Sequence, residues 1–360
     1  MKKRIIFLVL SVCAIINLPA QQQFNVQNGT KTEFYTDLET AIQKAVSGDT
    51  IYLPGQVIQV QNDLVIDKKL SIIGAGCDVD SIGGLHTTDI QKSDGSYANV
   101  NFRDGSDGSL ITGCIVNNIQ IGYINEFNEN IQNMQNITIW RNKTNGSIYL
   151  GVSATNNNIK NIFIKENQII FSGIRGNKAS NCWINNNLMN YYGVYDLNNS
   201  YIYNNVIGGA IGSLNGCVIE NNFIGDTNFN LNDASNPYSN YGIIQNCSFN
   251  NNAFASSNIS FPNGINGTNT GANNLINQES IKTFQVNYLN FPKNMVVRDT
   301  SPCKKAGTDG TDIGIFGGLT PYKAGAVPFN PHIDKAFISS QTDGTGVKLK
   351  IDMTVSAQDK

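Results

Sequence analysis

The stretch NCWINNNLM, Asn181 to Met189, places three consecutive asparagines between apolar residues. Asparagine is a poor helix former and is depleted in strands. The pattern nevertheless recurs along the chain, in nonamers that begin at Asn136, Asn161, Asn199, Gly216 and Asn246. A constant core repeated at uneven intervals is typical of a solenoid whose coils differ in loop length.

Fixed columns within these nonamers predict a strand followed by a bend. The second and fourth positions are mostly apolar, and alternate residues of a strand face the same side, so we expect both columns to point inward. The seventh position is always asparagine: Asn142, Asn167, Asn187, Asn205, Asn222 and Asn252. Asparagine tolerates the left-handed backbone of a tight bend. Amides stacked about 4.8 Å apart can also hydrogen-bond from coil to coil.

The residues after each nonamer predict that every repeat closes one coil. A second apolar stretch is followed by small residues, as in SGI at Ser172, YGV at Tyr192 and GGAI at Gly208. We interpret these as a further bend and strand. The sequence therefore predicts an all-β, single-stranded parallel β-helix over residues 48–318. A prion-like asparagine-rich tract, the competing interpretation, would show no fixed apolar columns.

Different elements are expected at the two ends of this solenoid. Residues 21–47 should form an N-terminal segment and a capping helix, in which Thr36 and Glu39 have capping-box spacing. Leu38, Ile42 and Val46 would form its apolar face. Residues 319–360 read as a connector and a C-terminal β-hairpin, KAFISSQTDGTGVKLKIDMTV, with alternating apolar residues.

Two segments resemble a known superfamily. SGDTIYLPG with LVIDKKLSIIGAG is similar to the N-terminal coils of secreted bacterial right-handed parallel β-helix proteins, the pectate-lyase-like superfamily. SPCKKAGTDGTDIGIFGG, from Ser301, resembles the element that often closes such domains. The resemblance implies the fold and its right-handed coil. It does not fix the function, because this fold carries lyases, hydrolases, epimerases and adhesins.

The N-terminus predicts export. MKKRIIFLVLSVCAIINLPA has the basic tip, apolar stretch and small final residue of a signal peptide over residues 1–20. No later stretch is long and apolar enough for a transmembrane anchor. We expect a secreted, periplasmic or cell-surface protein. Only 14% of residues are charged and the net charge is −2, which argues against a nucleic-acid partner.

The cysteines are interpreted mainly as core residues. Cys114, Cys182, Cys217 and Cys247 occupy the inward second column, where a thiol behaves as a small hydrophobe. Cys217 and Cys247 fall on neighbouring coils, so a disulfide between them remains open. The pairing of Cys77 and Cys303 cannot be decided from the sequence.

Outward-facing aromatic residues predict a polysaccharide partner. The third column places Phe163, Trp183 and Tyr201 on successive coils, and the fifth column adds Trp140 and Tyr203. Sugar rings pack their apolar faces on exposed aromatic rings. The alternative is that the C-terminal hairpin or a loop covers this row.

Candidate catalytic residues are sparse. A glycoside hydrolase needs two carboxylates about 5–9.5 Å apart, and Glu220 has no acidic neighbour in its column. Lyases of the resembling superfamily use Lys or Arg as the base and often calcium, so Lys165, Arg175 and Lys178 are the candidate bases. Glu166 and Asp196 are the nearest acidic candidates for calcium ligands. Asp104 and Asp107 are possible calcium ligands, although RDGSDGS is more typical of a turn.

The function that these features favour is non-catalytic glycan binding or surface presentation. A polysaccharide lyase or glycoside hydrolase acting on acidic polysaccharide, and a purely structural surface protein, remain the alternatives. Whether the protein is an enzyme stays open, as does its oligomeric state. No cofactor is expected, except calcium if the protein is a lyase.

Overall fold

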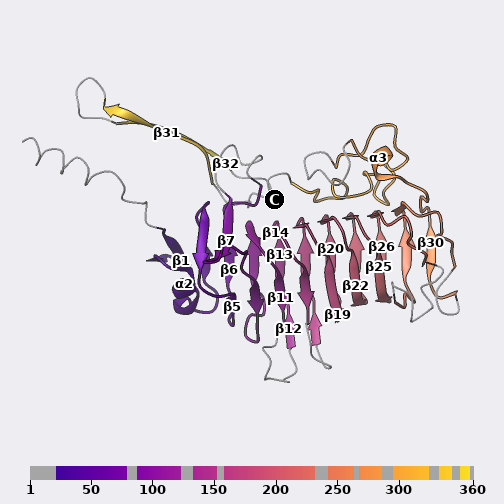
Figure 1. Ribbon diagram of the computed structural model, residues 1–360, viewed down its shortest axis with the longest axis horizontal. Coiled ribbons are helices and arrows are strands. Elements are labelled where there is room, and N and C mark those ends of the chain that lie inside the picture. Colours follow the sequence, from indigo (N-terminus) through magenta and orange to yellow (C-terminus); the bar gives the residue numbers. More distant parts are fainter. Residues whose placement is uncertain are drawn as a thin grey trace, which may run out of the picture.

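The chain winds into a long stack of coils that consists mostly of short β-strands (Figure 1). The computed structural model describes residues 22–78, 87–122, 133–151, 158–231, 242–262, 267–285, 295–323, 332–342 and 349–356. The predicted signal peptide lies outside these residues. Three sheets run along the stack, and we call them sheets A, B and C. Within them the strands of the repeats pair in parallel, which supports the predicted all-β parallel solenoid.

Sheet A holds the strands of the nonamers. In spatial order its strands are β2 (Lys31–Tyr35), β1 (Phe24–Asn28), β3 (Thr50–Tyr52), β6 (Ser71–Ile73), β9 (Leu110–Thr112), β13 (Thr138–Trp140), β17 (Phe163–Lys165), β20 (Trp183–Asn185), β23 (Tyr201–Tyr203), β26 (Val218–Glu220), β28 (Ser248–Asn250) and β30 (Thr270–Ala272). Only the pairings of β1 with β2 and β3 are antiparallel.

Sheets B and C complete each coil. Sheet B contains β4 (Val57–Val60), β7 (Thr88–Lys92), β10 (Cys114–Val116), β14 (Lys143–Thr144), β18 (Gln168–Ile169), β21 (Leu188–Met189), β24 (Val206–Ile207), β27 (Phe223–Ile224) and β29 (Ala253–Phe254). Sheet C contains β5 (Leu64–Ile66), β8 (Val100–Phe102), β11 (Ile119–Ile121), β15 (Ile148–Leu150), β19 (Ile174–Ser180), β22 (Val194–Asn198) and β25 (Ile211–Asn215), with β16 (Asn158–Lys160) and β12 (Asn133–Gln135) pairing beside β19.

The predicted inward columns form the core. All members of the fourth column are fully buried: Ile139, Ile164, Ile184, Ile202, Ile219 and Phe249. Parallel pairing brings each of them beside its counterpart on the next coil, as Ile184 lies beside Ile202. The second column is also buried, including Cys182, Cys217 and Cys247. Burial of these side chains supplies the main favourable term for folding.

The seventh-column asparagines form a hydrogen-bonded ladder, as predicted. The backbone N–H of Asn205 donates to Oδ1 of Asn222 at 3.0 Å, and its Nδ2 donates to the same oxygen at 2.9 Å. Nδ2 also donates to the carbonyl of Ile184. The same contacts link Asn222 to Asn252, although 30 positions separate them in the sequence. The ladder is therefore independent of the length of each coil.

The left-handed bend lies one residue before the position we expected. No seventh-column asparagine has a positive φ, whereas the sixth-column residues do, with φ between 52° and 58°: Arg141, Glu166, Asn186, Asn204, Asn221 and Asn251. The bend turns the following residue toward the interior, where its amide can reach the next coil. In the two coils without a sixth-column asparagine, Arg141 donates to Glu166 in a buried ion pair at 2.9 Å.

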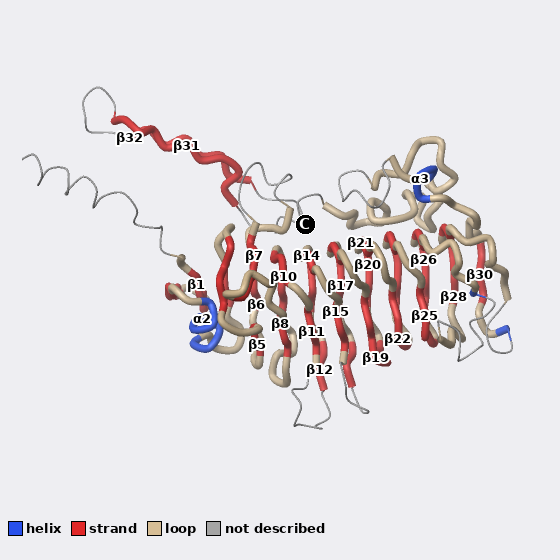
Figure 2. Tube along the Cα trace, in the orientation of Figure 1, coloured by secondary structure: helices blue, strands red, loops and turns tan. Residues whose placement is uncertain are grey.

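Helix α2 (Leu38–Lys44) forms within the segment predicted to be helical and lies against β1 and β2 (Figure 2). The expected capping box is wrong, because Asp37 is the N-cap residue and accepts the N–H of Thr40. Glu39 instead accepts the backbone N–H groups of Gln61 and Asn62. Val46 lies beyond the helix and is exposed.

Residues from the C-terminal part of the chain cover the outer face of sheet B. Phe284, which follows the short helix α3 (Ser280–Thr283), packs with Ile313 and Ile315 on Leu188 and Phe223. Three side chains also hold this cover by hydrogen bonds: Asn186 donates to the carbonyls of Ile315 and Gly317, Asn251 to the carbonyl of Ala306, and Gln168 to the hydroxyl of Tyr322. Leu188, Val206, Phe223 and Ala253 of sheet B are therefore fully buried.

Strands β31 (His332–Thr342) and β32 (Leu349–Ser356) pair antiparallel in the segment for which the sequence predicts a hairpin. Among the described strands they pair only with each other. The hairpin extends away from the coils and lies far from β20 and β26 (Figure 1). The described hairpin therefore does not cover the aromatic row of sheet A.

The ladder predicts a measurable loss of stability on removing one amide. Asn205→Ala should lower the free energy of unfolding by about 1–3 kcal/mol, because buried donors and acceptors on two neighbouring coils lose their partners. Urea denaturation of the purified protein checks this value. Asn62→Ala, at an exposed position outside the ladder, is the matched control and should unfold like the parent protein. Equal midpoints for all three proteins would contradict the ladder.

Candidate functional site

The predicted aromatic row exists on the outer face of sheet A. Phe163, Trp183 and Tyr201 lie in register on β17, β20 and β23. The ring centroids of Phe163 and Trp183 are 4.8 Å apart with planes 9° from parallel, and those of Trp183 and Tyr201 are 6.0 Å apart at 10°. We call these three stacked rings the aromatic ladder.

The aromatic ladder does not form the flat strip that we expected. Nearly parallel rings at a centroid distance of 4.8 Å are stacked, with their faces turned toward one another. Trp183 has a ring on both sides, so it presents mainly an edge to solvent. A sugar packs on the face of a ring, and only the end rings have a face without an aromatic neighbour. Tyr201 is the end ring that is most open, with 46% of its surface exposed.

Trp140 is part of a compact charged cluster. The Lys165 ammonium lies 4.2 Å from the centroid of the Trp140 ring, and the Arg141 guanidinium lies 4.5 Å from it. Glu166 accepts the indole N–H at 2.9 Å and the Nε–H of Arg141 at 2.9 Å. Burial lowers the pKa of Lys165. Cation–π and hydrogen-bonding contacts of this kind are stabilising, and the Lys165 ammonium takes part in them through the ring of Trp140.

Two other predicted residues lie farther along the same face. Tyr203 and Glu220 are neighbours in register, and the residue beyond Glu220 is Asn250. The Nδ2 of Asn250 donates to Oε1 of Glu220 at 3.0 Å. Burial raises the pKa of Tyr203. Among the residues that the structure describes, Glu220 therefore has no acidic neighbour in its row of sheet A, as the sequence predicted.

The basic candidates do not gather at one place. Lys165 points outward from sheet A, whereas Arg175 lies on β19 of sheet C and Lys178 at the bend within that strand. Asp196 lies at the corresponding bend of β22. The Arg175 guanidinium is 5.9 Å from the centroid of the Tyr195 ring. It forms no ion pair with any residue of the described chain.

The two aspartates considered as calcium ligands lie in a turn between strands. Asp107 accepts the backbone N–H of Gln135 at 3.0 Å and so links its turn to the next coil. Asp104 lies in the same turn. Within the described residues, no three His, Cys, Asp or Glu side chains gather in a group that could hold a metal ion.

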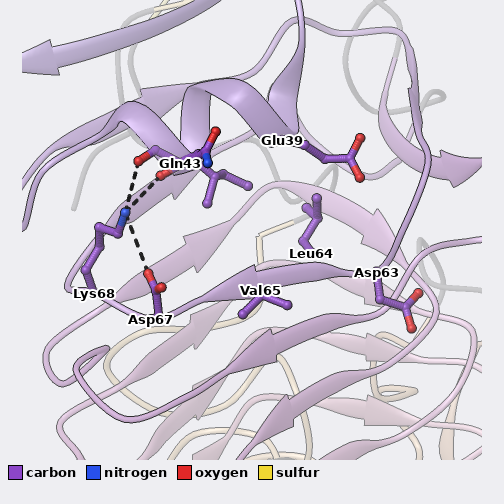
Figure 3. Close-up of a pocket in the computed structure, with 8 residues that line it drawn as sticks. Glu39, Gln43, Asp63, Leu64, Val65, Asp67 and Lys68 are labelled. Carbon is purple, nitrogen blue, oxygen red and sulfur yellow. Dashed lines mark hydrogen bonds and ion pairs between the residues drawn. The ribbon is translucent and has the colours of Figure 1, made fainter. Parts of the chain in front are cut away.

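A pocket of about 280 Å³ lies between helix α2 and β5 (Figure 3). Its charged groups are already engaged. The Lys68 ammonium donates to the carbonyls of Ile42, Gln43 and Ala45 and lies 3.6 Å from Asp67. Asp63 accepts two hydrogen bonds from Asn99. The pocket therefore reflects how the helix is attached to the coils.

The structure reveals exposed aromatics that we did not single out in the sequence. Phe171, Tyr191 and Tyr192 lie at the bend between sheets B and C and are 62%, 56% and 51% exposed. The rings of Phe171 and Tyr191 are 6.3 Å apart. The bends stack tightly, since a Cβ on Gly193 would overlap the carbonyl of Ala210. The repeated motif of an aromatic residue before a small one, FSG and YYG, was the available signal.

The inward cysteines also have a role beyond packing. The backbone N–H of Cys182 donates to Oγ of Ser200, that of Cys217 to Sγ of Cys247, and that of Cys247 to Oδ1 of Asn269. Ser200, Cys247 and Asn269 in this column thus each offer an acceptor to the preceding coil. All six described cysteines, including Cys77 and Cys303, are buried free thiols, so Cys217 and Cys247 form no disulfide here.

A scan against known protein families and searches of curated proteins and of solved structures found no match for this chain. None of the helices in the described residues has the length and apolar character needed to cross a membrane.

The buried column predicts an unreactive thiol. Burial raises the pKa of Cys182 to about 12, so the nucleophilic thiolate is scarce at neutral pH. Labelling by a maleimide, followed by mass spectrometry of the Cys182 peptide, should be slow in the native protein and fast in denaturant. Ser93→Cys, at an exposed turn, gives the fast native control. Native labelling of Cys182 at the rate of that control would contradict the inward column.

The stacked geometry predicts that Trp183 contributes to stability. Trp183→Ala removes two aromatic contacts worth about 0.5–1.5 kcal/mol each, so the free energy of unfolding should fall by at least about 1–3 kcal/mol. Phe34→Ala is the matched control, since Phe34 is an exposed aromatic near the N-terminal edge of sheet A. If both variants unfold like the parent protein, the rings do not support one another.

Proposed function

We propose that this protein is a secreted or cell-surface right-handed parallel β-helix protein of the pectate-lyase-like kind that binds an acidic polysaccharide. The binding surface is the bend between sheets B and C together with the adjoining part of sheet C. We call the side chains of Phe171, Arg175, Tyr191 and Tyr192 the corner patch.

The observation that carries this proposal is the exposure of the corner patch. Three aromatic side chains, each more than half exposed, lie on two neighbouring coils. Their apolar surface is in contact with water. A ligand with an apolar face would displace this water and bury the surface, which is favourable. Pyranose rings have such faces, and their rims of hydroxyl groups remain hydrated. A sugar polymer is therefore a better match than a wholly apolar ligand.

The charge beside the aromatic rings favours an acidic sugar. Arg175 is exposed, forms no ion pair with a described residue and is four positions after Phe171. A guanidinium can bind a carboxylate or sulfate through two parallel hydrogen bonds. Lys178 adds a second exposed cation, and Asp196 on the adjoining coil offsets part of this charge. Coils about 4.8 Å apart offer repeated contacts to a linear polymer that runs along the stack.

Binding of polygalacturonate tests the proposal. Arg175→Gln and Tyr191→Ala should each weaken binding about tenfold in isothermal titration calorimetry, a change of about 1.4 kcal/mol. Phe34→Ala is the control: it removes an exposed aromatic side chain outside the corner patch and should bind like the parent protein. Heparin in place of polygalacturonate would show whether sulfate is preferred. No binding of either polymer, or equal affinities for all variants, would refute the proposal.

Catalysis remains an alternative function of the same surface. A lyase would release unsaturated uronates, detected by ultraviolet absorbance, and a hydrolase would release reducing ends. The structure gives no specific support for either reaction, since Lys165 lies on another face and Glu220 has no acidic neighbour in its row. A purely structural surface protein would bind no glycan at all.

A further inference from the structure

The row of aromatic rings on sheet A ends abruptly. In register after Tyr201 come Val218 on β26, Ser248 on β28 and Thr270 on β30. These side chains are much smaller than an aromatic ring. Trp183 stacks on one face of Tyr201, and the other face is turned toward the shorter side chain of Val218. The part of that second face that extends beyond the Val218 side chain is therefore exposed to solvent, in keeping with the 46% exposure of Tyr201.

The change from the large ring of Tyr201 to the small side chains of Val218 and Ser248 forms a step in the surface of sheet A. This step has room for a single sugar ring. Neighbouring strands are about 4.8 Å apart, so Tyr201 and Ser248 are separated by two spacings, or about 10 Å. Val218 lies between them and forms an apolar floor. A pyranose stacked on the free face of Tyr201 would rest above Val218, with Ser248 on its other side.

Hydrogen-bonding groups flank the step on one side. Glu220 is two residues after Val218 on the same strand and also points outward. Its Oε1 accepts Asn250 Nδ2, which also donates to Oγ of Ser248 at 3.0 Å. Within the described chain, no hydrogen bond is made to Oε2 of Glu220. A carboxylate oxygen held in this way is a strong acceptor for a sugar hydroxyl.

We infer that Tyr201, Val218 and Glu220 form a binding site for a neutral pyranose at the end of the aromatic ladder. The ring face of Tyr201 supplies stacking, and Glu220 accepts hydroxyl donors. Glu220 repels a uronate or a sulfated sugar, so this site differs in charge preference from the corner patch. It lies on sheet A, whereas Arg175 lies on sheet C. The inference does not depend on the acidic-polysaccharide proposal.

The opposite end of the aromatic ladder is a poorer site. Phe163 is less exposed than Tyr201, and its neighbour in register is Thr138. Beside it Lys165 lies over the ring of Trp140. The adjacent polar groups are thus engaged with each other, while at the Tyr201 end one carboxylate oxygen remains open.

Neutral hexasaccharides test this inference on the full-length mature protein. Cellohexaose, xylohexaose, mannohexaose and laminarihexaose would each be examined by saturation-transfer NMR and then by calorimetry. We expect at least one to bind, and we expect Tyr201→Ala and Glu220→Gln each to weaken binding about tenfold. Tyr201→Phe keeps the ring face and should retain most of the affinity, which separates loss of stacking from loss of fold.

Arg175→Gln is the control that separates the two surfaces. It should leave binding of the neutral sugar unchanged while it weakens binding of polygalacturonate. The inference is overturned if none of the four hexasaccharides binds, if Tyr201→Ala and Glu220→Gln bind as the parent does, or if Arg175→Gln alone abolishes binding. Failure of both polygalacturonate and heparin to bind would refute the proposed function and leave this result unaffected.

Discussion

The hydrogen bonds between buried asparagine amides at the bend between sheets A and B hold the coils in register. Each amide satisfies a backbone N–H of the preceding coil and donates to that coil and its own. Buried backbone groups at a bend would otherwise lose their partners, at a cost comparable to a lost hydrogen bond. Because each amide fixes the position of the next coil, side chains at equivalent outward positions are aligned along the coils that the ladder joins, from Asn142 to Asn274.

Repeated columns made most of the fold predictable from the sequence. Fixed positions of Ile and Asn indicated the inward faces and the ladder. The position of the left-handed residue was not predictable, since asparagine occupies both the sixth and the seventh positions in four coils, as at Asn204 and Asn205. Either residue suits such a bend, and only the three-dimensional structure shows which of them turns inward.

The outward surfaces were only partly predictable. Strand alternation placed Phe163, Trp183 and Tyr201 in one row, but ring tilt depends on packing between neighbours, so the stacking of faces was not evident. The corner aromatics were missed because they lie in bends of variable length, outside the aligned columns. Grouping Lys165 with Arg175 failed for a related reason. The two residues are close in sequence, but the chain passes two bends between them, so they lie on different sheets.

The continuity of the asparagine ladder between Asn222 and Asn252 has a practical consequence. The intervening segment is longer than in the two adjoining coils, yet the equivalent hydrogen bonds are made at the same length on both sides. The entropy of closing a loop grows only slowly with its length, so extra residues in a coil cost little stability. The coil between these two asparagines is thus a natural insertion point at which a foreign peptide or a small domain could be displayed without disturbing the scaffold.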